Sequence, residues 1–166
     1  MKPGDDSVFI DLIELLIFLE KSEIDQPGKR IDIVMPEDQL NLVRDFKSTP
    51  MSDLKEGLTK EYTEAFSHET KHDIDYIITL GGDGTILYAA NHFNTGSIPP
   101  MITFAQGSLG FMCNFTFEDH EAVLRPILLS AINGMVADEV GLESRLRLKV
   151  NMGPGCSANK QVFRGD

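Results

Sequence analysis

The chain has 166 residues, 42% of them hydrophobic, which is enough for one full core and not for two. Its 26 acidic and 15 basic residues give a net charge of −11, so we expect neither nucleic acid nor a membrane as a partner. The two cysteines, Cys113 and Cys156, lie far apart and form no metal-binding pair. Free thiols in a reducing cytoplasm are therefore expected, without a zinc or iron–sulfur centre.

The first half of the chain predicts a helix, a strand and a second helix, followed by a polar connection. Residues 7–21 are mostly apolar but too short and too charged to cross a bilayer, which indicates a core-facing helix. The β-branched run 31–35 ends at a proline and predicts a strand. Residues 37–46 have one apolar side, as expected for a short helix. Residues 47–73 are polar and of mixed charge, so we expect a mobile connection outside the core.

The central part of the chain carries two glycine loops. The apolar run 74–80 predicts a buried strand; the turn Gly81-Gly82-Asp83-Gly84 and a helix over 85–94 follow it. A second strand, 101–104, leads directly into a second loop, 106–111. Because strands of a βαβ unit are parallel, both loops should lie at the carboxyl edge of one sheet, where α/β proteins bind ligands. This order favours a phosphate or nucleotide site; the alternative is a tight turn with Asp83 as an ordinary helix cap.

The last part of the chain changes its pattern. A helix is expected over 118–133, after which residues 145–152 alternate strictly between polar and apolar. That alternation is typical of an antiparallel strand with one face, here Arg145, Arg147 and Lys149, in solvent. We therefore predict a boundary near 136–142. The expected fold is α/β: a Rossmann-like parallel sheet over 1–140, with the first strand of an all-β second domain in 141–166.

These motifs resemble those of the NAD kinases, in particular the eukaryotic members of that family. The resemblance covers residues 8–152 and rests on Gly81-Gly82-Asp83-Gly84-Thr85, Pro99-Pro100-Met101 and Gly107-Ser108-Leu109-Gly110-Phe111. It implies transfer of the terminal phosphoryl group of ATP to the 2′-hydroxyl of the adenosine ribose of NAD, which gives NADP. It also implies Mg²⁺ or another divalent cation, small-molecule nucleotides as ligands, and a homo-oligomeric, cytoplasmic protein.

The resemblance assigns roles to individual residues. Asp83 matches the general base of the family, although a role in holding Mg²⁺ is equally compatible with the sequence. The residues implied to bind the nucleotides are Gly81, Gly82, Gly84, Thr85, Gly107, Ser108, Leu109, Gly110 and Phe111. Phe111 would lie against the dinucleotide; the alternative is simple core packing. No side chain is assigned as a dedicated metal ligand.

Two departures from the family pattern limit the prediction. The family's Asn-Glu or Asn-Asp pair, which binds the adenine end of the nucleotide, does not occur in these 166 residues. The first strand of the usual fold is also missing, since Lys2-Pro3 resembles its end. We therefore expect a fragment that is inactive alone. The alternatives are a lipid kinase of the diacylglycerol or sphingosine type, which shares the Gly-Gly-Asp-Gly-Thr turn, and a non-catalytic nucleotide-binding fragment.

Overall fold

A parallel sheet of five strands organises the chain in the computed structural model. The structure describes residues 5–24, 29–48, 57–62, 64–67, 69, 71–93, 97–106, 110–134 and 144–153. The strands are β1 (Lys29–Val34), β2 (Tyr76–Leu80), β3 (Met101–Ala105), β4 (Phe115–Thr116) and β5 (Ser144–Met152), in the order β1-β5-β2-β3-β4. Every pairing between neighbouring strands is parallel. The predicted α/β class with a Rossmann-like parallel sheet is confirmed.

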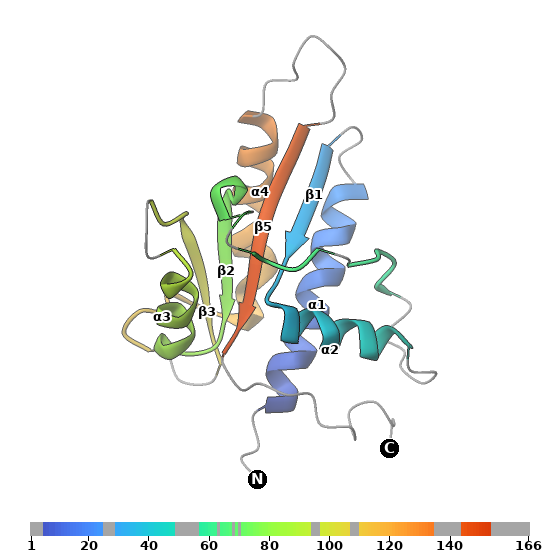
Figure 1. Ribbon diagram of the computed structural model, residues 1–166. Helices are drawn as coiled ribbons and strands as arrows, with labels where there is room; N and C mark the ends of the chain where they lie inside the picture. The colour runs from blue at the N-terminus through green and yellow to red at the C-terminus, as the bar shows by residue number, and fades with distance from the viewer. Residues whose placement is uncertain are drawn as a thin grey trace.

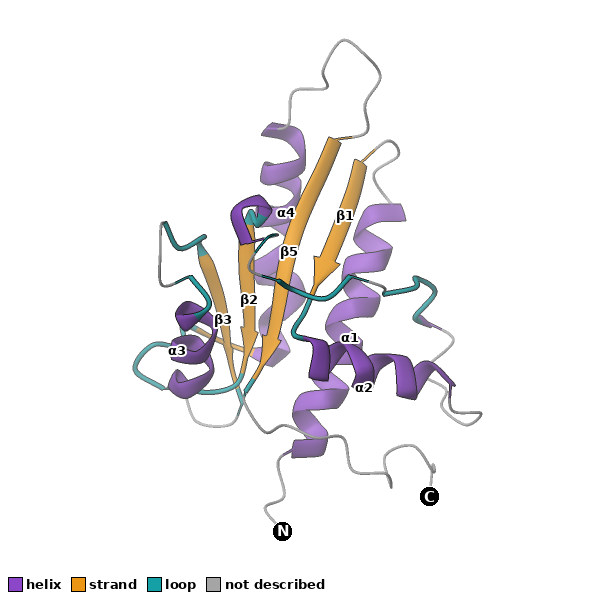
Figure 2. Cartoon of the chain, viewed as in Figure 1, coloured by secondary structure: helices purple, strands orange, loops and turns teal. Residues whose placement is uncertain are grey.

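Helices cover both faces of this sheet. They are α1 (Asp5–Ile24), α2 (Glu37–Ser48), α3 (Asp83–Asn91) and α4 (His120–Gly134), with short 3₁₀ turns at Lys71–Asp73 and Phe117–Asp119. Figure 1 shows α1 and α4 behind the sheet and α3 in front of it, with the strand arrows pointing the same way. Figure 2 shows that α3 follows directly from the carboxyl end of β2. Each predicted helix is present, within a few residues of its expected ends.

The main hydrophobic core lies between the sheet and α1, α2 and α4. Alternate strand residues such as Ile78, Phe104 and Val150 point into it and are fully buried. A smaller cluster on the other face joins Val34, Ile77, Ala89 and Phe93 beneath α3. Because β2 and β3 bury both faces, their sequences are apolar almost without interruption, as parallel central strands require.

The prediction for residues 145–152 is wrong in orientation and exposure. β5 runs parallel to β1 and β2 and lies between them, with Leu148 paired to Ile33 and to Tyr76. Its polar side is buried as well, since Arg147 is 5% exposed and Lys149 is 0% exposed. The physical reason is that other segments of the chain cover this side of β5. Arg147 pairs with Glu64 and Asp73, and Lys149 lies over the rings of Phe66 and Phe93. Alternating polarity therefore did not indicate a solvated face.

The predicted division into two domains remains a prediction. β5 joins the same sheet as the other four strands, so it does not itself open a separate β-rich unit. The boundary expected at 136–142 and the chain after Gly153 lie outside the described residues, as does Lys2-Pro3.

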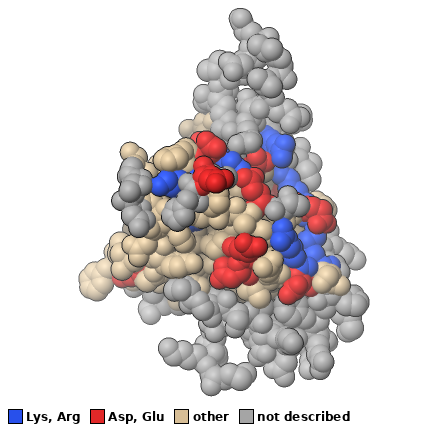
Figure 3. Space-filling model, viewed as in Figure 1, with Lys and Arg blue, Asp and Glu red and all other residues tan. Residues whose placement is uncertain are grey.

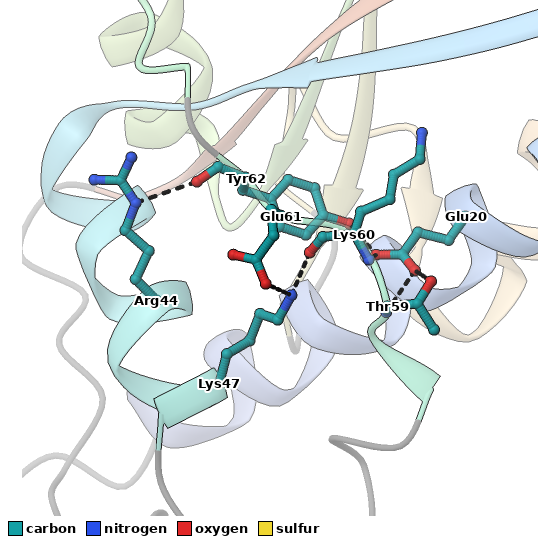
Figure 4. A network of polar contacts seen from close by, with 7 residues as sticks. All are labelled: Glu20, Arg44, Lys47, Thr59, Lys60, Glu61 and Tyr62. Atoms are coloured by element: carbon teal, nitrogen blue, oxygen red, sulfur yellow. Dashed lines mark hydrogen bonds and ion pairs between the residues drawn. The ribbon is translucent and has the colours of Figure 1, made fainter.

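Residues 57–62, in the polar segment after α2, pack against the core, whereas a connection outside the core was expected; residues 49–56 lie outside the described residues. Leu58 and Tyr62 are buried against α1 and α2. The attachment centres on Glu20 of α1, which is 3% exposed (Figure 4). Its carboxylate accepts hydrogen bonds from Thr59 N (2.7 Å), Thr59 Oγ1 (2.7 Å), Lys60 N (3.1 Å) and the Tyr62 hydroxyl (2.7 Å). A buried carboxylate with four donors is fully satisfied, so it orders the segment.

Replacing Glu20 with glutamine should lower the free energy of unfolding by about 3 kcal/mol, because the new amide N–H₂ would face N–H and O–H donors that lose their acceptor. Urea unfolding measures the difference. Glu61→Gln is the control: Glu61 is 81% exposed and pairs with Lys47 at the surface, so a change below about 0.5 kcal/mol is expected. Equal effects of the two substitutions would show that the Glu20 network does not hold the segment.

Candidate nucleotide site at the carboxyl edge of the sheet

The turn between β2 and α3 needs a glycine at its first position. Gly81 has φ of +145°, a backbone conformation that other residues rarely adopt. A Cβ at this position would also lie 2.3 Å from Thr85 Oγ1. The Gly81 N–H donates to the Phe104 carbonyl of β3 at 3.0 Å. Gly81 therefore lets the chain leave the sheet and start α3 within two residues.

The beginning of α3 is open on its outer side. Gly82 is the N-cap residue, and Gly82 and Gly84 are both exposed, with nothing within 4 Å of a Cβ placed on either. The N–H groups of a first helical turn lack intrahelical acceptors, and the helix dipole adds partial positive charge there. This end of α3 can therefore accept an anion such as a phosphate through backbone amides.

Asp83 is the first residue of α3 and not its cap, so the alternative of an ordinary capping aspartate does not describe the turn. Its carboxylate points to the second loop instead. Oδ2 accepts a hydrogen bond from Phe111 N at 3.2 Å, and Oδ1 accepts one from Met112 N at 3.0 Å. The carboxylate is half-buried, so one side of it still reaches solvent.

The structure thus brings the glycine turn together with the end of the second loop. Besides the two bonds to Asp83, the Cys113 thiol donates to the Gly81 carbonyl at 3.3 Å. Gly110 lies close enough to the Asp83 carboxylate that a Cβ there would be 2.3 Å from Oδ1. The other predicted members of this loop, Gly107, Ser108 and Leu109, lie outside the described residues.

Two predicted residues take different positions at this edge. Thr85 is 5% exposed, and its hydroxyl fills the space beside Gly81, so contact with phosphate through that hydroxyl is less favoured than contact through backbone amides. Phe111 is 104% exposed, which excludes the core-packing alternative. Together with Met112, at 44% exposure, it forms an apolar surface beside Asp83 that can stack against a planar ring.

Sequence reasoning missed the residues that support the second loop. Thr103 of β3 donates its hydroxyl to the Met112 carbonyl at 3.2 Å and accepts from Asn114 N at 3.2 Å. At the start of the loop, the Gln106 amide donates to Asp11 of α1. Burial raises the pKa of Asp11, and the bond from Gln106 opposes that rise. The sequence signals for this support were Thr103 within an apolar strand and Asp11 within an apolar helix. Single polar residues at such positions are common and do not by themselves indicate a contact with a loop.

Cys113 is a structural thiol in this arrangement. It is 4% exposed, and burial, together with the negative charge of Asp83, raises its pKa. A thiol with a raised pKa stays protonated at neutral pH and is a poor nucleophile. Cys113 is free, as expected; Cys156 lies outside the described residues.

On the face drawn in Figure 3, Lys and Arg side chains lie among Asp and Glu side chains. Among the described residues, no group of three or more His, Cys, Asp and Glu side chains could hold a metal ion, and no helix is long and apolar enough to span a bilayer.

A parallel sheet with a glycine turn, an open helix N-terminus and a carboxylate at its carboxyl edge is typical of the class of α/β proteins that bind phosphorylated ligands at this edge. Within that class, the chain belongs to the NAD kinase family: the ATP-NAD kinase N-terminal domain matches residues 9–132. The resemblance inferred from the two glycine loops is confirmed.

Named relatives agree with this assignment. The chain is 32% identical over 129 residues to the mitochondrial NADH kinase of Saccharomyces cerevisiae, a match that covers 78% of this chain and 30% of the relative. It is 44% identical over 84 residues to the ATP-NADH kinase of the same yeast, covering 49% of this chain and 15% of the relative. The crystal structure of yeast NADH kinase complexed with NADH aligns with 63% of this chain and 37% of that one, with 25% identity and a TM-score of 0.37. The chain therefore spans less than a third of the length of these two sequence relatives.

Proposed function

We propose that the chain forms the nucleotide-binding part of an NAD kinase that transfers the terminal phosphoryl group of ATP to the adenosine ribose 2′-hydroxyl of NAD or NADH. In this reaction the 2′-oxygen forms a bond to the γ-phosphorus, the bond from that phosphorus to the β–γ bridging oxygen breaks, and ADP leaves. The observation that carries the proposal is the Asp83 carboxylate, which lies between an open helix N-terminus and an exposed aromatic residue.

The residues of the site divide into three roles. The backbone amides of Gly82, Asp83 and Gly84 would hold phosphate, because they lie at the start of α3, where Gly82 and Gly84 are exposed. The Asp83 carboxylate would accept a hydrogen bond from the ribose hydroxyl and take its proton as the phosphoryl group arrives. Phe111 would stack against a ring of the dinucleotide. Gly107, Ser108 and Leu109 would also contact the nucleotide, as the family resemblance implies.

Mg²⁺ fits this set of residues as a nucleotide-held ion. Mg²⁺ usually binds through one or two carboxylates together with substrate phosphates, and Asp83 supplies one carboxylate at the phosphate end. When bound, the ion would neutralise the charge on the transferring phosphates. Whether Asp83 serves as base or as metal ligand is decided by the metal dependence of an Asp83→Asn variant.

Other predictions go with this function. A lipid kinase is not favoured, because the matched family and relatives are NAD or NADH kinases. The cytoplasmic location remains a prediction, and one of the two yeast relatives is mitochondrial. The homo-oligomer implied by the resemblance also remains a prediction. Because the chain spans only part of its relatives, we expect it to bind nucleotide on its own and to show no turnover.

A chimaera tests the function directly. The matched segment of this chain would replace its 129-residue counterpart in the yeast mitochondrial NADH kinase. The chimaera should form NADP or NADPH from ATP, Mg²⁺ and the corresponding dinucleotide. Asp83→Asn should lower kcat by about 100- to 10,000-fold. Asp38→Asn, on the exposed first turn of α2, is the matched control and should leave kcat unchanged. A folded chimaera without product, or undiminished activity in Asp83→Asn, would contradict the proposal.

A further inference from the structure

Both oxygens of the Asp83 carboxylate are held by neighbouring backbone amides. Phe111 N donates to Oδ2 and Met112 N donates to Oδ1, so two consecutive N–H groups contact the two oxygens. Hydrogen bonds from backbone N–H groups to an ionised carboxylate are among the stronger ones in proteins. The contact joins residues 28 and 29 positions apart and connects the two glycine loops.

Gly110 brings the loop close enough for these bonds. A Cβ at Gly110 would lie 2.3 Å from Asp83 Oδ1, 2.9 Å from Cγ and 3.2 Å from Oδ2. The need for glycine here is one of space, because a side chain would overlap the Asp83 carboxylate. The overlap falls on the end of the Asp83 side chain, so we expect an added methyl group to displace the carboxylate from the two amides.

The far side of the loop has further attachments, and one of them, the Cys113 thiol, also lies 4.0 Å from Asp83 Oδ1. Thr103 binds the Met112 carbonyl and Asn114 N, and the Cys113 thiol binds the Gly81 carbonyl. The loop therefore has other attachments to the sheet, whereas the carboxylate is oriented by the two amides.

We propose that Gly110 and the amides of Phe111 and Met112 position the reactive carboxylate, with Gly110 acting as a positioning residue for phosphoryl transfer. This inference rests on the proposed function. Each carboxylate oxygen has about two lone-pair sites, so the amides occupy one on each oxygen. The remaining lone pairs then have a fixed direction toward the open side, where the ribose hydroxyl would bind. A carboxylate turned away from the amides would present no fixed acceptor to that hydroxyl.

The arrangement also changes how an Asp83→Asn variant is interpreted. Asparagine would keep one acceptor oxygen and place an N–H₂ group against a backbone N–H. Such a variant loses both the base and one attachment of the loop, so its loss of activity has two sources. Gly110→Ala keeps the carboxylate and removes only its orientation, which separates the two.

Amide hydrogen exchange and NMR of the 166-residue chain test the geometry. Gly110→Ala and Asp83→Ala should each speed exchange of the Phe111 and Met112 amides by about tenfold or more and shift their proton resonances upfield. Gly84→Ala is the matched control: it also adds a methyl group beside Asp83, but in open space, and should change neither readout. Unchanged exchange and resonances in Gly110→Ala would overturn the proposal.

Kinetics in the chimaera test the consequence. Gly110→Ala should lower kcat by about 10- to 100-fold, with KM for both substrates changed less than about threefold. In the Asp83→Asn background, Gly110→Ala should cause no further loss. An additive loss, or an effect on KM alone, would contradict positioning through Asp83. If the unmodified chimaera forms no product, the proposed function fails, and the exchange measurement still decides whether Gly110 orients the carboxylate.

Discussion

Gly81→Ala is expected to lower the free energy of unfolding by about 3–5 kcal/mol. The alanine would have to adopt φ of +145°, which costs about 1–3 kcal/mol in strain. Its methyl group would also meet Thr85 Oγ1 at 2.3 Å, and relief of that overlap costs a similar amount. Urea unfolding followed by circular dichroism measures the sum.

Gly82→Ala, one residue further along the turn, provides the matched control. Gly82 has φ of −92° and ψ of −171°, an extended conformation open to any residue, and a Cβ there meets nothing within 4 Å. Its effect on stability should stay within about 0.5 kcal/mol. Comparable destabilisation by both variants would show that the turn does not have the backbone described above.

Lys149→Met is expected to stabilise the protein by about 2–4 kcal/mol at pH 7. The amine is buried in the middle of the sheet; its Nζ lies 2.8 Å from His92 Nδ1 and 4.0 Å from the centre of the Phe66 ring. Burial lowers the pKa of Lys149 to about 7, from its ordinary value of 10.5. Methionine has a similar length and no charge to desolvate, so it removes this cost.

The same burial gives stability a defined pH dependence. Between pH 7 and 10.5 the unfolded chain binds a proton at Lys149 that the folded chain has released, so the contribution of Lys149 to stability should rise with pH in this window. Below pH 7 the amine is charged in both states, and this contribution should be constant. The difference in unfolding free energy between wild type and Lys149→Met should therefore shrink from pH 7 to pH 10. Lys21→Met, at an exposed position of α1, should show no such trend; a constant difference for Lys149→Met would contradict the burial.

The parts of the fold that the sequence predicted correctly depend on short-range patterns. Continuous apolar runs gave β2 and β3, and their connection through a helix implied parallel pairing, which the register of Ile78 with Ile102 confirms. The amphipathic segment 37–46 likewise appears as α2, with Leu40, Val43 and Phe46 buried. These elements needed no knowledge of distant contacts.

The prediction for β5 was wrong because the position of this strand depends on long-range contacts. Alternation in the sequence shows which side of a strand is polar, and it does not show whether other parts of the chain cover that side. Here the polar side is covered by Glu64, Phe66, Asp73 and His92. The cost of this coverage is visible: within the described residues, Arg147 Nε and both side-chain polar atoms of Asn151 are buried without a hydrogen-bond partner. No local pattern would place such a strand between two others in the interior of a sheet.

The sequence predicted which residues form the candidate site, and it did not predict the contacts between them. The glycine turn indicated Asp83 and an open helix start, and topology indicated that the second loop would meet it. That Phe111 and Met112 would contact the carboxylate through their backbone was not predictable, because backbone donors carry no side-chain signal. The support from Thr103 was hidden for a related reason, since threonine is common in strands.

The central claim is that nucleotide binds at the start of α3, and an NMR titration of the chain with NAD and with ATP·Mg²⁺ tests it most directly. The amide resonances of Gly82, Asp83 and Gly84 are expected to shift first and furthest, together with those of Phe111 and Met112. A cavity of about 350 Å³, lined among others by Arg30, Lys60 and Tyr62, contains no residue of α3 or of the two glycine loops. The resonances of its lining residues serve as an internal reference. Shifts centred on that cavity, or none at the start of α3 with saturating nucleotide, would contradict the account.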